Sequence, residues 1–361
     1  MKPRNIAIAC GVAGVAFGLA AAAGIVYRKQ IKSVASLKRL TDYADGYDLY
    51  AIDIAYDYDL DRIIAAGVRD DQAYIDAVMA QVLPGMPVHV QAPQFACSAF
   101  VAVDAEGRVR TGRNYDFKDD TSALLVRNHP RDGYASIGFA ALNNLGTNAP
   151  LDSVAGRTAA LMGPFAQLDG VNECGVSIAV LTLDSKPSDQ DTQRPVINTS
   201  LAIRLVLDRA ATTQDAVDLL SAYDMHAMAG RDYHFFINDA AGDARVVEWD
   251  PRDPDRACKA TPVRQVTNFY ACYADEVLAN QKNGELGHGK ERAIAIADVL
   301  DAHAGAQDEA VVRKALRAAA QEPNPDDITS NTQWSVVFDN TEPTAAITLR
   351  RHWGDIDAFA L

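Results

Sequence analysis

Cysteine is scarce in this sequence, and the arrangements that usually give it a defined role are missing. The chain has five cysteines in 361 residues, too few for the disulfide framework of a small secreted scaffold. No CxxC or HExxH pattern occurs, and the seven histidines are scattered without ligand spacing. The sequence therefore gives no support to a zinc site, and we expect neither a metal nor an organic cofactor.

Positive charge is scarce outside the N-terminus. The net charge is -14, and residues 1–40 contain seven Lys or Arg and no acid, so the acidic surplus falls on residues 41–361. Nucleic-acid binding relies on clustered Lys and Arg. The acidic body therefore argues against a nucleic-acid partner. The length and the 48% hydrophobic content fit one large globular domain or two ordinary ones.

Charge is absent from an apolar run over residues 6–27. Roughly 20 such residues can span a bilayer as a helix. Small residues at 20–23 would also suit a cleaved signal peptide, but Arg28 and Lys29 follow at once, so we favour a membrane anchor within residues 1–28. A buried core helix fits less well, because the run has no polar face. Five positive charges follow the run and two precede it, which by the positive-inside rule would keep the body cytoplasmic, so the topology stays open.

Residues 29–96, called the leader here, differ from the rest of the chain in their predicted secondary structure. It reads mostly as helix, because apolar residues recur at helical spacing near its end. Aspartates at 53, 57, 59 and 61 lack the glycine and terminal glutamate of a calcium loop, so we interpret them as a solvated acidic face. From residue 97 onward, short runs rich in β-branched and aromatic residues surround two predicted helices at 200–223 and 289–321. This order indicates a layered α+β fold.

Cys97 begins the first of these strands, and a hairpin follows it. Residues 104–108 read as the turn, with Gly107 supplying the positive φ that such loops need. If Asp104 pairs with Arg108, Cys97 lies opposite residue 115, give or take one. The turn alone therefore predicts that the cluster at 113–116 returns to the side of the cysteine.

That cluster contains charged groups with a chemical use. An arginine such as Arg113 next to a cysteine favours the thiolate, which is the nucleophilic form, and Asp116 can orient an amine or a substrate. The two are three residues apart and would face opposite ways on a flat strand. Both can serve Cys97 only if a bend or bulge lies between them. The alternative is an ordinary buried thiol beside a surface ion pair.

The order of motifs after Cys97 resembles a known family. The stretches CSAF, GRNYDF, GVNECGVSIAVL, FFINDAAGDARVVEWD, VTNF and SVVFD are similar to the choloylglycine hydrolase family of linear-amide C–N hydrolases. That family includes bile salt hydrolases and penicillin V acylases, with acid ceramidase and N-acylethanolamine acid amidase as relatives. The resemblance covers 97–361 and implies an Ntn-hydrolase αββα four-layer sandwich, preceded here by the hydrophobic helix and the helical leader.

The resemblance also implies roles for individual residues. They are Cys97 as the N-terminal nucleophile, Arg113 as the neighbour of the thiol, Asp116 as a ligand of the free α-amine, Asn268 as the side-chain oxyanion donor and Arg292 as the helix arginine that completes the site. Bile salt hydrolases have an asparagine where this chain has Thr182. An oxyanion contact there would pass to the backbone N–H, and recognition of bile salts in particular is not implied. Asn172, Glu173 and the cysteines at 174, 258 and 272 read as structural.

A cysteine nucleophile needs a base, and no Cys/His arrangement is recognisable. An α-amino group has a pKa of about 7.7–8.0 and can take this role. Freeing it requires cleavage between Ala96 and Cys97, which the thiol is expected to perform on the Ala96 carbonyl. The leader (29–96) would then be a propeptide or a small retained subunit, and 97–361 the catalytic domain.

We therefore expect a self-processing amidase that acts on a small-molecule N-acyl amide with an apolar acyl part. An acyltransferase of the same fold and an uncleaved membrane-anchored binding protein are the alternatives. The protein is expected to be membrane-anchored through residues 6–27 or secreted, with its catalytic domain outside the cytoplasm. Assembly into a homo-oligomer is compatible with the sequence.

Overall fold

Two large β-sheets form the centre of the protein in the computed structural model, which describes residues 27–84, 96–146, 151, 153–281, 286–324 and 330–361. Within these residues sheet A has nine strands, in the spatial order β1 (Lys38–Arg39), β2 (Leu49–Ile54), β5 (Ala123–Asn128), β6 (Ser136–Ala141), β7 (Gln167–Asn172), β8 (Ser177–Leu183), β11 (Asp232–Asn238), β12 (Ala244–Trp249) and β13 (Cys258–Pro262). Sheet B has six, in the order β14 (Gln265–Val266), β3 (Ala96–Val103), β4 (Val109–Asp116), β15 (Thr332–Asp339), β16 (Thr344–Leu349) and β17 (Asp357–Ala360). A separate parallel pair joins β9 (Val196–Asn198) and β10 (Asp224–His226).

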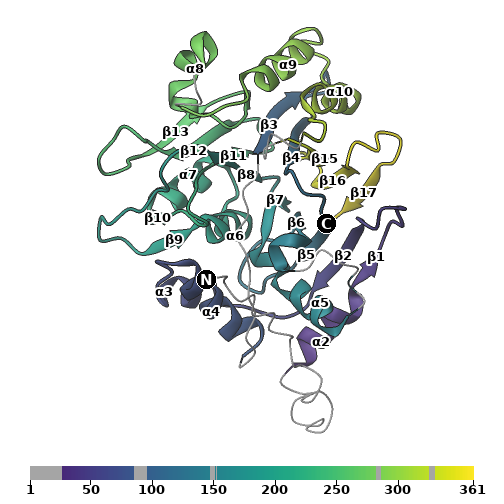
Figure 1. The fold of residues 1–361 in the computed structure, drawn as a ribbon, viewed down its shortest axis with the longest axis vertical. Helices are drawn as coiled ribbons and strands as arrows, with labels where there is room; N and C mark the ends of the chain where they lie inside the picture. Colours follow the sequence, from purple (N-terminus) through teal and green to yellow (C-terminus); the bar gives the residue numbers. More distant parts are fainter. Residues whose placement is uncertain (1–26, 85–95, 147–150, 152, 282–285, 325–329) are drawn as a thin grey trace, which may run out of the picture.

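Helices cover the outer faces of both sheets. The helices of the described residues are α2 (Arg28–Ser36), α3 (Leu60–Ala65), α4 (Asp71–Val82), α5 (Val154–Ala159), α6 (Thr199–Arg209), α7 (Thr213–Ser221), α8 (Ala274–Asn280), α9 (Lys290–Asp301) and α10 (Glu309–Ala319), with 3-10 turns at Leu142–Leu145, Ala160–Phe165 and Ala271–Tyr273. α6 and α7 pack on β7, β8, β11 and β12, whereas α9 and α10 pack on β3, β4, β14 and β15 (Figure 1). Because β3 also contacts β8 and β11 of the other sheet, the layers run helix, sheet, sheet, helix. The predicted α+β architecture is confirmed.

Each of the two long predicted helices is divided into two shorter ones. The helix predicted over 200–223 is broken after Arg209, and the side chain of Thr212 accepts a hydrogen bond from the Asp215 N–H to begin α7. The helix predicted over 289–321 is broken in the same way, and Asp308 caps α10. Ser, Thr, Asp and Asn satisfy the free N–H groups at a helix start, so each cap marks a new helix.

The prediction of a mostly helical leader is wrong for Leu49–Ile54. These residues form β2, which pairs in parallel with β5, Leu49 opposite Ala123. All of its side chains except Asp53 are buried. A short apolar run that is buried on both faces has no clear period, so its sequence does not distinguish a strand from a helix. The leader therefore contributes a strand inside sheet A.

The helices of the leader also belong to the main core. Ile63 of α3 and Val78 and Val82 of α4 are fully buried and belong to one hydrophobic cluster with the strands of sheet A. Burying a Val or Ile side chain stabilises a fold by about 1.5–3 kcal/mol. The leader is therefore packed as part of the domain rather than as an appendage.

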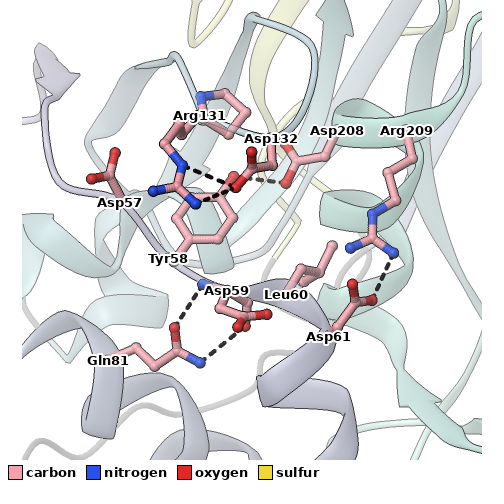
Figure 2. A pocket seen from close by; sticks show the side chains of 11 residues that line it. Asp57, Tyr58, Asp59, Leu60, Asp61, Gln81, Arg131, Asp132, Asp208 and Arg209 are labelled. Carbon is pink, nitrogen blue, oxygen red and sulfur yellow. Dashed lines mark hydrogen bonds and ion pairs between the residues drawn. The ribbon is translucent and has the colours of Figure 1, made fainter.

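A polar cavity of about 510 Å³ lies where the leader meets the body (Figure 2). Its lining consists of residues 57–61, Gln81, residues 130–132, Asp208 and Arg209. Arg209 pairs with Asp61 at 2.8 Å across this boundary, and the Tyr58 hydroxyl donates to Asp208 at 2.7 Å. None of the predicted site residues lines this cavity.

The predicted N-terminal hydrophobic helix at residues 6–27 lies, apart from Tyr27, outside the described residues. Of the helices that the structure describes, none combines the length and the apolar character needed to cross a bilayer. The expectation of an anchor or signal therefore stays a prediction.

Candidate active site

The β3–β4 hairpin has the register that the sequence predicts. The Asp104 N–H donates to the Arg108 carbonyl at 3.1 Å, and Gly107 has a φ of 82°. Cys97 consequently lies directly opposite Tyr115. Turn chemistry alone therefore brings the cluster at 113–116 beside the cysteine.

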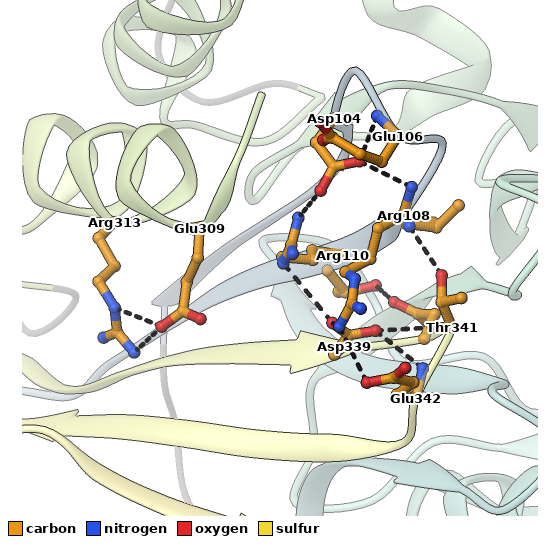
Figure 3. A network of polar contacts seen from close by, with 12 residues as sticks. Asp104, Glu106, Arg108, Arg110, Glu309, Arg313, Asp339, Thr341 and Glu342 are labelled. Atoms are coloured by element: carbon orange, nitrogen blue, oxygen red, sulfur yellow. Dashed lines mark hydrogen bonds and ion pairs between the residues drawn. The ribbon is translucent and has the colours of Figure 1, made fainter. Parts of the chain in front are cut away.

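The turn of this hairpin is fixed by an ion-pair network at the end of the sheet that lies away from Cys97 (Figure 3). Arg110 lies 2.8 Å from Asp104 and 3.7 Å from Asp339. Arg108 also pairs with Asp339, at 3.2 Å, and with Glu342 at 3.0 Å. Since Asp339 ends β15, the network ties the β3–β4 turn to the neighbouring strand. A one-residue slip of β3, which would turn Cys97 to the other face, would displace Asp104 from Arg110.

Cys97 is buried in a polar environment. Its thiol has no solvent exposure, and burial raises its pKa to about 11, while the neighbouring Arg113 guanidinium acts to lower it. Arg113 is itself fully buried and donates from Nη2 to the Val180 carbonyl at 3.2 Å. A buried arginine is costly unless it is paired, so its position beside a thiol calls for a further anionic partner.

That partner is Asp169, which sequence analysis missed. Asp169 lies in β7 of sheet A, and its Oδ2 is 2.7 Å from Arg113 Nε. Trp334 Nε1 donates to the same oxygen at 3.1 Å. Burial raises the pKa of Asp169 to about 6, and the Arg113 charge opposes this shift. The available signal was a single acid in the apolar strand QLDGV, because a buried charge implies a buried partner.

The bulge expected between Arg113 and Asp116 is not found on β4, whose residues 113–116 pair in regular register with β3. A register shift does occur beside Asp116, on the neighbouring strand β15. Asp116 pairs with Thr332 of β15 while Tyr115 pairs with Trp334, so Gln333 is an extra residue. The irregularity thus lies on β15 and not on β4 itself. It brings the Thr332 hydroxyl to donate to Asp116 Oδ1 at 2.6 Å.

Two side chains from distant parts of the sequence meet the main chain of Cys97. The Cys97 N–H donates to Asn268 Oδ1 at 2.8 Å, and Arg292 Nη1 donates to the Cys97 carbonyl at 2.6 Å. Arg292 Nη2 also donates to Asn268 Oδ1 at 2.8 Å, and Nη1 lies 3.4 Å from Asp116. Gln321 Nε2, which sequence analysis did not identify, donates to Asp116 at 2.8 Å. The structure therefore brings all five predicted catalytic residues into one buried cluster.

Comparison with known proteins identifies a matching protein family and similar solved structures. The family described as acyl-coenzyme A:6-aminopenicillanic acid acyl-transferase matches residues 103–352, well over half of the chain. The chain belongs to this acyl-transferase family. The match, together with the solved structures below, confirms the predicted kinship with the choloylglycine hydrolase family. No curated protein sequence matches the chain.

Solved structures of this kind share the fold. Penicillin V acylase from Agrobacterium tumefaciens is 21% identical, with a TM-score of 0.55, over 73% of this chain and 86% of that chain. A mutant conjugated bile acid hydrolase from Clostridium perfringens is 14% identical, with a TM-score of 0.57, over 73% and 92%. At these identities the likeness is one of fold.

Thr182 is the position at which this member of the acyl-transferase family departs from the predicted pattern. Its carbonyl accepts a hydrogen bond from Asn268 Nδ2 at 2.8 Å, so it lies at the site. Its hydroxyl is buried and has no hydrogen-bond partner in the part of the chain that the structure describes. The role predicted for its backbone N–H stays a prediction.

Neighbouring residues of this family member behave as structural elements. The Asn172 carbonyl accepts from Gly175 N at 2.9 Å, and its side chain accepts from Cys174 N and Val176 N, which is the predicted turn-shaping role. The cysteines that the structure describes are free thiols. Among the same residues no group of three or more His, Cys, Asp or Glu side chains is arranged to hold a metal ion.

Proposed function

We propose that the chain is a self-processing N-terminal-cysteine amidase that hydrolyses a linear amide C–N bond of an N-acylated small molecule. The observation that carries this proposal is the convergence of Asn268 and Arg292 on the backbone N–H and carbonyl of Cys97. A cysteine that only fills the core needs no charged group on its main chain. A cysteine whose nitrogen becomes the catalytic base does.

Self-processing would begin with the Cys97 thiol and the Ala96 carbonyl. The sulfur forms a bond to the carbonyl carbon, the Ala96–Cys97 C–N bond breaks, and the nitrogen takes up the proton that leaves the sulfur. Water then hydrolyses the thioester and releases a carboxylate at Ala96. The strand β3 runs through this peptide bond, with Ala96 paired to Asp116 and Cys97 to Tyr115. The bond is therefore held between two ordered pairs.

In turnover the freed α-amine would take the proton of the Cys97 thiol. Asn268 Oδ1 already lies 2.8 Å from this nitrogen, and burial raises the pKa of the nearby Asp116. The thiolate attacks the substrate carbonyl, and Asn268 together with a backbone N–H, for which Thr182 is the candidate, holds the oxyanion. The amine passes its proton to the leaving amine, and water hydrolyses the thioester. Loss of one oxyanion donor typically costs about 10²–10³ in rate.

The leader is proposed to remain with the catalytic chain as a small subunit. Its strand β2 is paired on both sides, to β1 and to β5, and Asp48 accepts hydrogen bonds from Arg39 and Thr41 while it lies fully buried. Release would expose the edge of β5. The alternative of a discarded propeptide is tested by whether the fragment before Cys97 stays bound.

An acyltransferase of the same fold is the second candidate, and the description of the matching family favours it. In that reaction an amine, rather than water, would take the acyl group from Cys97. Added amine acceptors distinguish the two, because a transferase forms a new amide while a hydrolase releases only the acid. The third candidate, an uncleaved binding protein anchored by residues 6–27, predicts a folded chain that never breaks before Cys97.

The decisive experiment is intact mass spectrometry of purified wild type and Cys97→Ala, followed by assay on penicillin V, glycine-conjugated bile acids, acyl-homoserine lactones and N-acylethanolamines. We expect a wild-type fragment that begins at Cys97, and neither cleavage nor turnover in Cys97→Ala. A folded wild type that stays intact would overturn the proposal. Cell fractionation of the same protein tests the proposed attachment or export through residues 6–27.

A further inference from the structure

A buried histidine and a buried glutamate contact the segment that contains Asn268 and have no role in the proposed self-processing or amide hydrolysis. His234 is in β11 and Glu248 in the adjacent strand β12, and neither has any solvent exposure. His234 Nδ1 lies 3.2 Å from Glu248 Oε2. Burying polar or charged groups costs free energy of folding unless they are paired and hydrogen-bonded. We therefore asked which part of the structure the pair supports.

The hydrogen bonds of the pair end on both sides of Asn268. On one side His234 Nε2 donates to the carbonyl of Thr267 at 3.1 Å. On the other side Glu248 accepts from the Ala271 N–H at 2.9 Å and from the Cys272 N–H at 2.6 Å. The segment 267–272, which contains Asn268, is therefore held at its start and at its end by one pair of side chains.

The contacts also bear on the protonation of the pair. A carbonyl oxygen only accepts, so His234 Nε2 carries a hydrogen. Glu248 accepts two backbone N–H groups, which favours its ionised form, and an ionised Glu248 accepts a hydrogen bond from Nδ1. In that state His234 has a hydrogen on both ring nitrogens and is an imidazolium paired with a carboxylate.

The same segment is connected to the helix that carries Arg292. The Thr267 hydroxyl donates to the Gly289 carbonyl at 2.9 Å, and Gly289 is the N-cap of α9. A Cβ atom at Gly289 would lie 2.7 Å from the Thr267 hydroxyl and 2.5 Å from an Arg292 nitrogen. With so little room, a shift of Thr267 would also displace the start of α9.

We propose that the His234–Glu248 ion pair positions Asn268, and through Thr267 also Arg292, against the main chain of Cys97. His234 and Glu248 are positioning residues, since neither contacts Cys97. The test of this inference by kcat rests on the proposed function, because it requires that the chain hydrolyses an amide. It makes a separate claim about the protonation of His234 that needs no substrate.

The variants are His234→Gln and Glu248→Gln, with Asp208→Asn as the matched control. Asp208 also belongs to a buried ion pair, 2.7 Å from Arg204, but none of the hydrogen bonds of that pair reaches residues 267–272. The control therefore removes a comparable buried charge pair without touching the segment of Asn268.

The first readout is nitrogen NMR of ¹⁵N-histidine-labelled protein at pH 7, with the His234 signal assigned by its loss in His234→Gln. We expect a directly bonded hydrogen on both ring nitrogens. One bare nitrogen would overturn the ion pair. This result stands whether or not the chain hydrolyses any amide.

The second readout is rate. In both glutamine variants we expect kcat, and the rate of cleavage before Cys97, to fall about 10-fold or more, because an interaction with a charged group is lost. KM and the alkylation rate of the Cys97 thiol should stay within about twofold, and Asp208→Asn should keep its kcat. Unchanged rates, or an equal fall in Asp208→Asn, would overturn the positioning role. If wild type cleaves itself but hydrolyses none of the amides, the proposed function fails. The cleavage rates of the two glutamine variants would still test the positioning role.

Discussion

Arg292 donates a hydrogen bond of 2.6 Å to the carbonyl oxygen of Cys97. A helix side chain thereby holds the backbone of a strand residue that is 195 positions earlier in the sequence. The same guanidinium holds Asn268 Oδ1. The orientation of the bond that we propose is cut and that of the proposed oxyanion donor therefore depend on one residue.

Replacing Arg292 by Gln is expected to slow cleavage before Cys97 by about 10- to 100-fold, since hydrogen bonds to charged groups contribute about 1.5–3 kcal/mol. The measurement is the rate at which the fragment starting at Cys97 appears by mass spectrometry. Arg264→Gln is the matched control, because Arg264 pairs with Asp301 of the same helix at the surface. Equal cleavage rates in the two variants would contradict the role of Arg292.

The thiol of the uncleaved chain is expected to be unreactive near neutral pH. Its pKa of about 11 lies two units above the usual value of 9.0 because of burial, so the thiolate fraction is about 100-fold lower than for an exposed cysteine. Alkylation of Cys97 by iodoacetamide in the fraction of an Arg292→Gln preparation that is still uncleaved, followed by mass spectrometry, should accelerate steadily as the pH rises toward 11. A rate at pH 7 equal to that of a free cysteine would show that the thiol is already activated.

Thr182→Val should leave activity within about threefold and stability unchanged or slightly increased. Its hydroxyl has no hydrogen-bond partner among the described residues, and a buried unsatisfied hydroxyl costs about 1–3 kcal/mol. Thr332→Val is the contrasting variant, because that hydroxyl donates to Asp116 at 2.6 Å, and it should lower activity about 10-fold. If Thr182→Val lost activity to the same extent, the Thr182 hydroxyl itself would have to contact the substrate.

Asp169 predicts a pH dependence of stability. Its pKa of about 6 lies above its usual value of 3.8, so the folded chain holds this proton more tightly than the unfolded chain. The stabilisation is complete below pH 3.8 and is lost as the pH rises through 6, by about 3 kcal/mol. Urea unfolding of wild type and Asp169→Asn at pH 4, 5, 6 and 7 measures it. Only wild type should show this fall, and parallel curves for the two proteins would refute it.

The leader should stay with the catalytic chain after cleavage. Size-exclusion chromatography of the cleaved protein is expected to give one peak that contains both fragments, and denaturant should separate them. Ile63→Asp, which places a charge in the core, should weaken the association, whereas a substitution at the exposed Asp42 should not. Two separate peaks without denaturant would mean that the leader is a discarded propeptide.

The sequence was sufficient for the β3–β4 hairpin, whose register is set by its turn. The glycine turn predicted that Cys97 lies opposite residue 115, give or take one, and Tyr115 is the observed partner. Asn268 and Arg292 were reached only through the family resemblance, because no spacing rule relates positions so far apart to Cys97.

The remaining features depend on contacts between distant segments. Asp169 reaches Arg113 from the other sheet, and the His234–Glu248 pair depends on strand pairing that no local pattern specifies. The leader strand β2 was missed for the same reason. Its partner β5 begins more than 70 residues later, in a parallel pairing that leaves no turn signal in the sequence.

The position of β2 inside sheet A determines what the proposed cleavage would do to refolding. Before cleavage the strand and its partner belong to one covalent chain, so refolding from denaturant is a first-order process that does not depend on dilution. After cleavage the same sheet has to be rebuilt from two molecules, and its recovery becomes second order in protein concentration. Self-cleavage would therefore leave a catalyst that, once unfolded and diluted, does not find its own structure again.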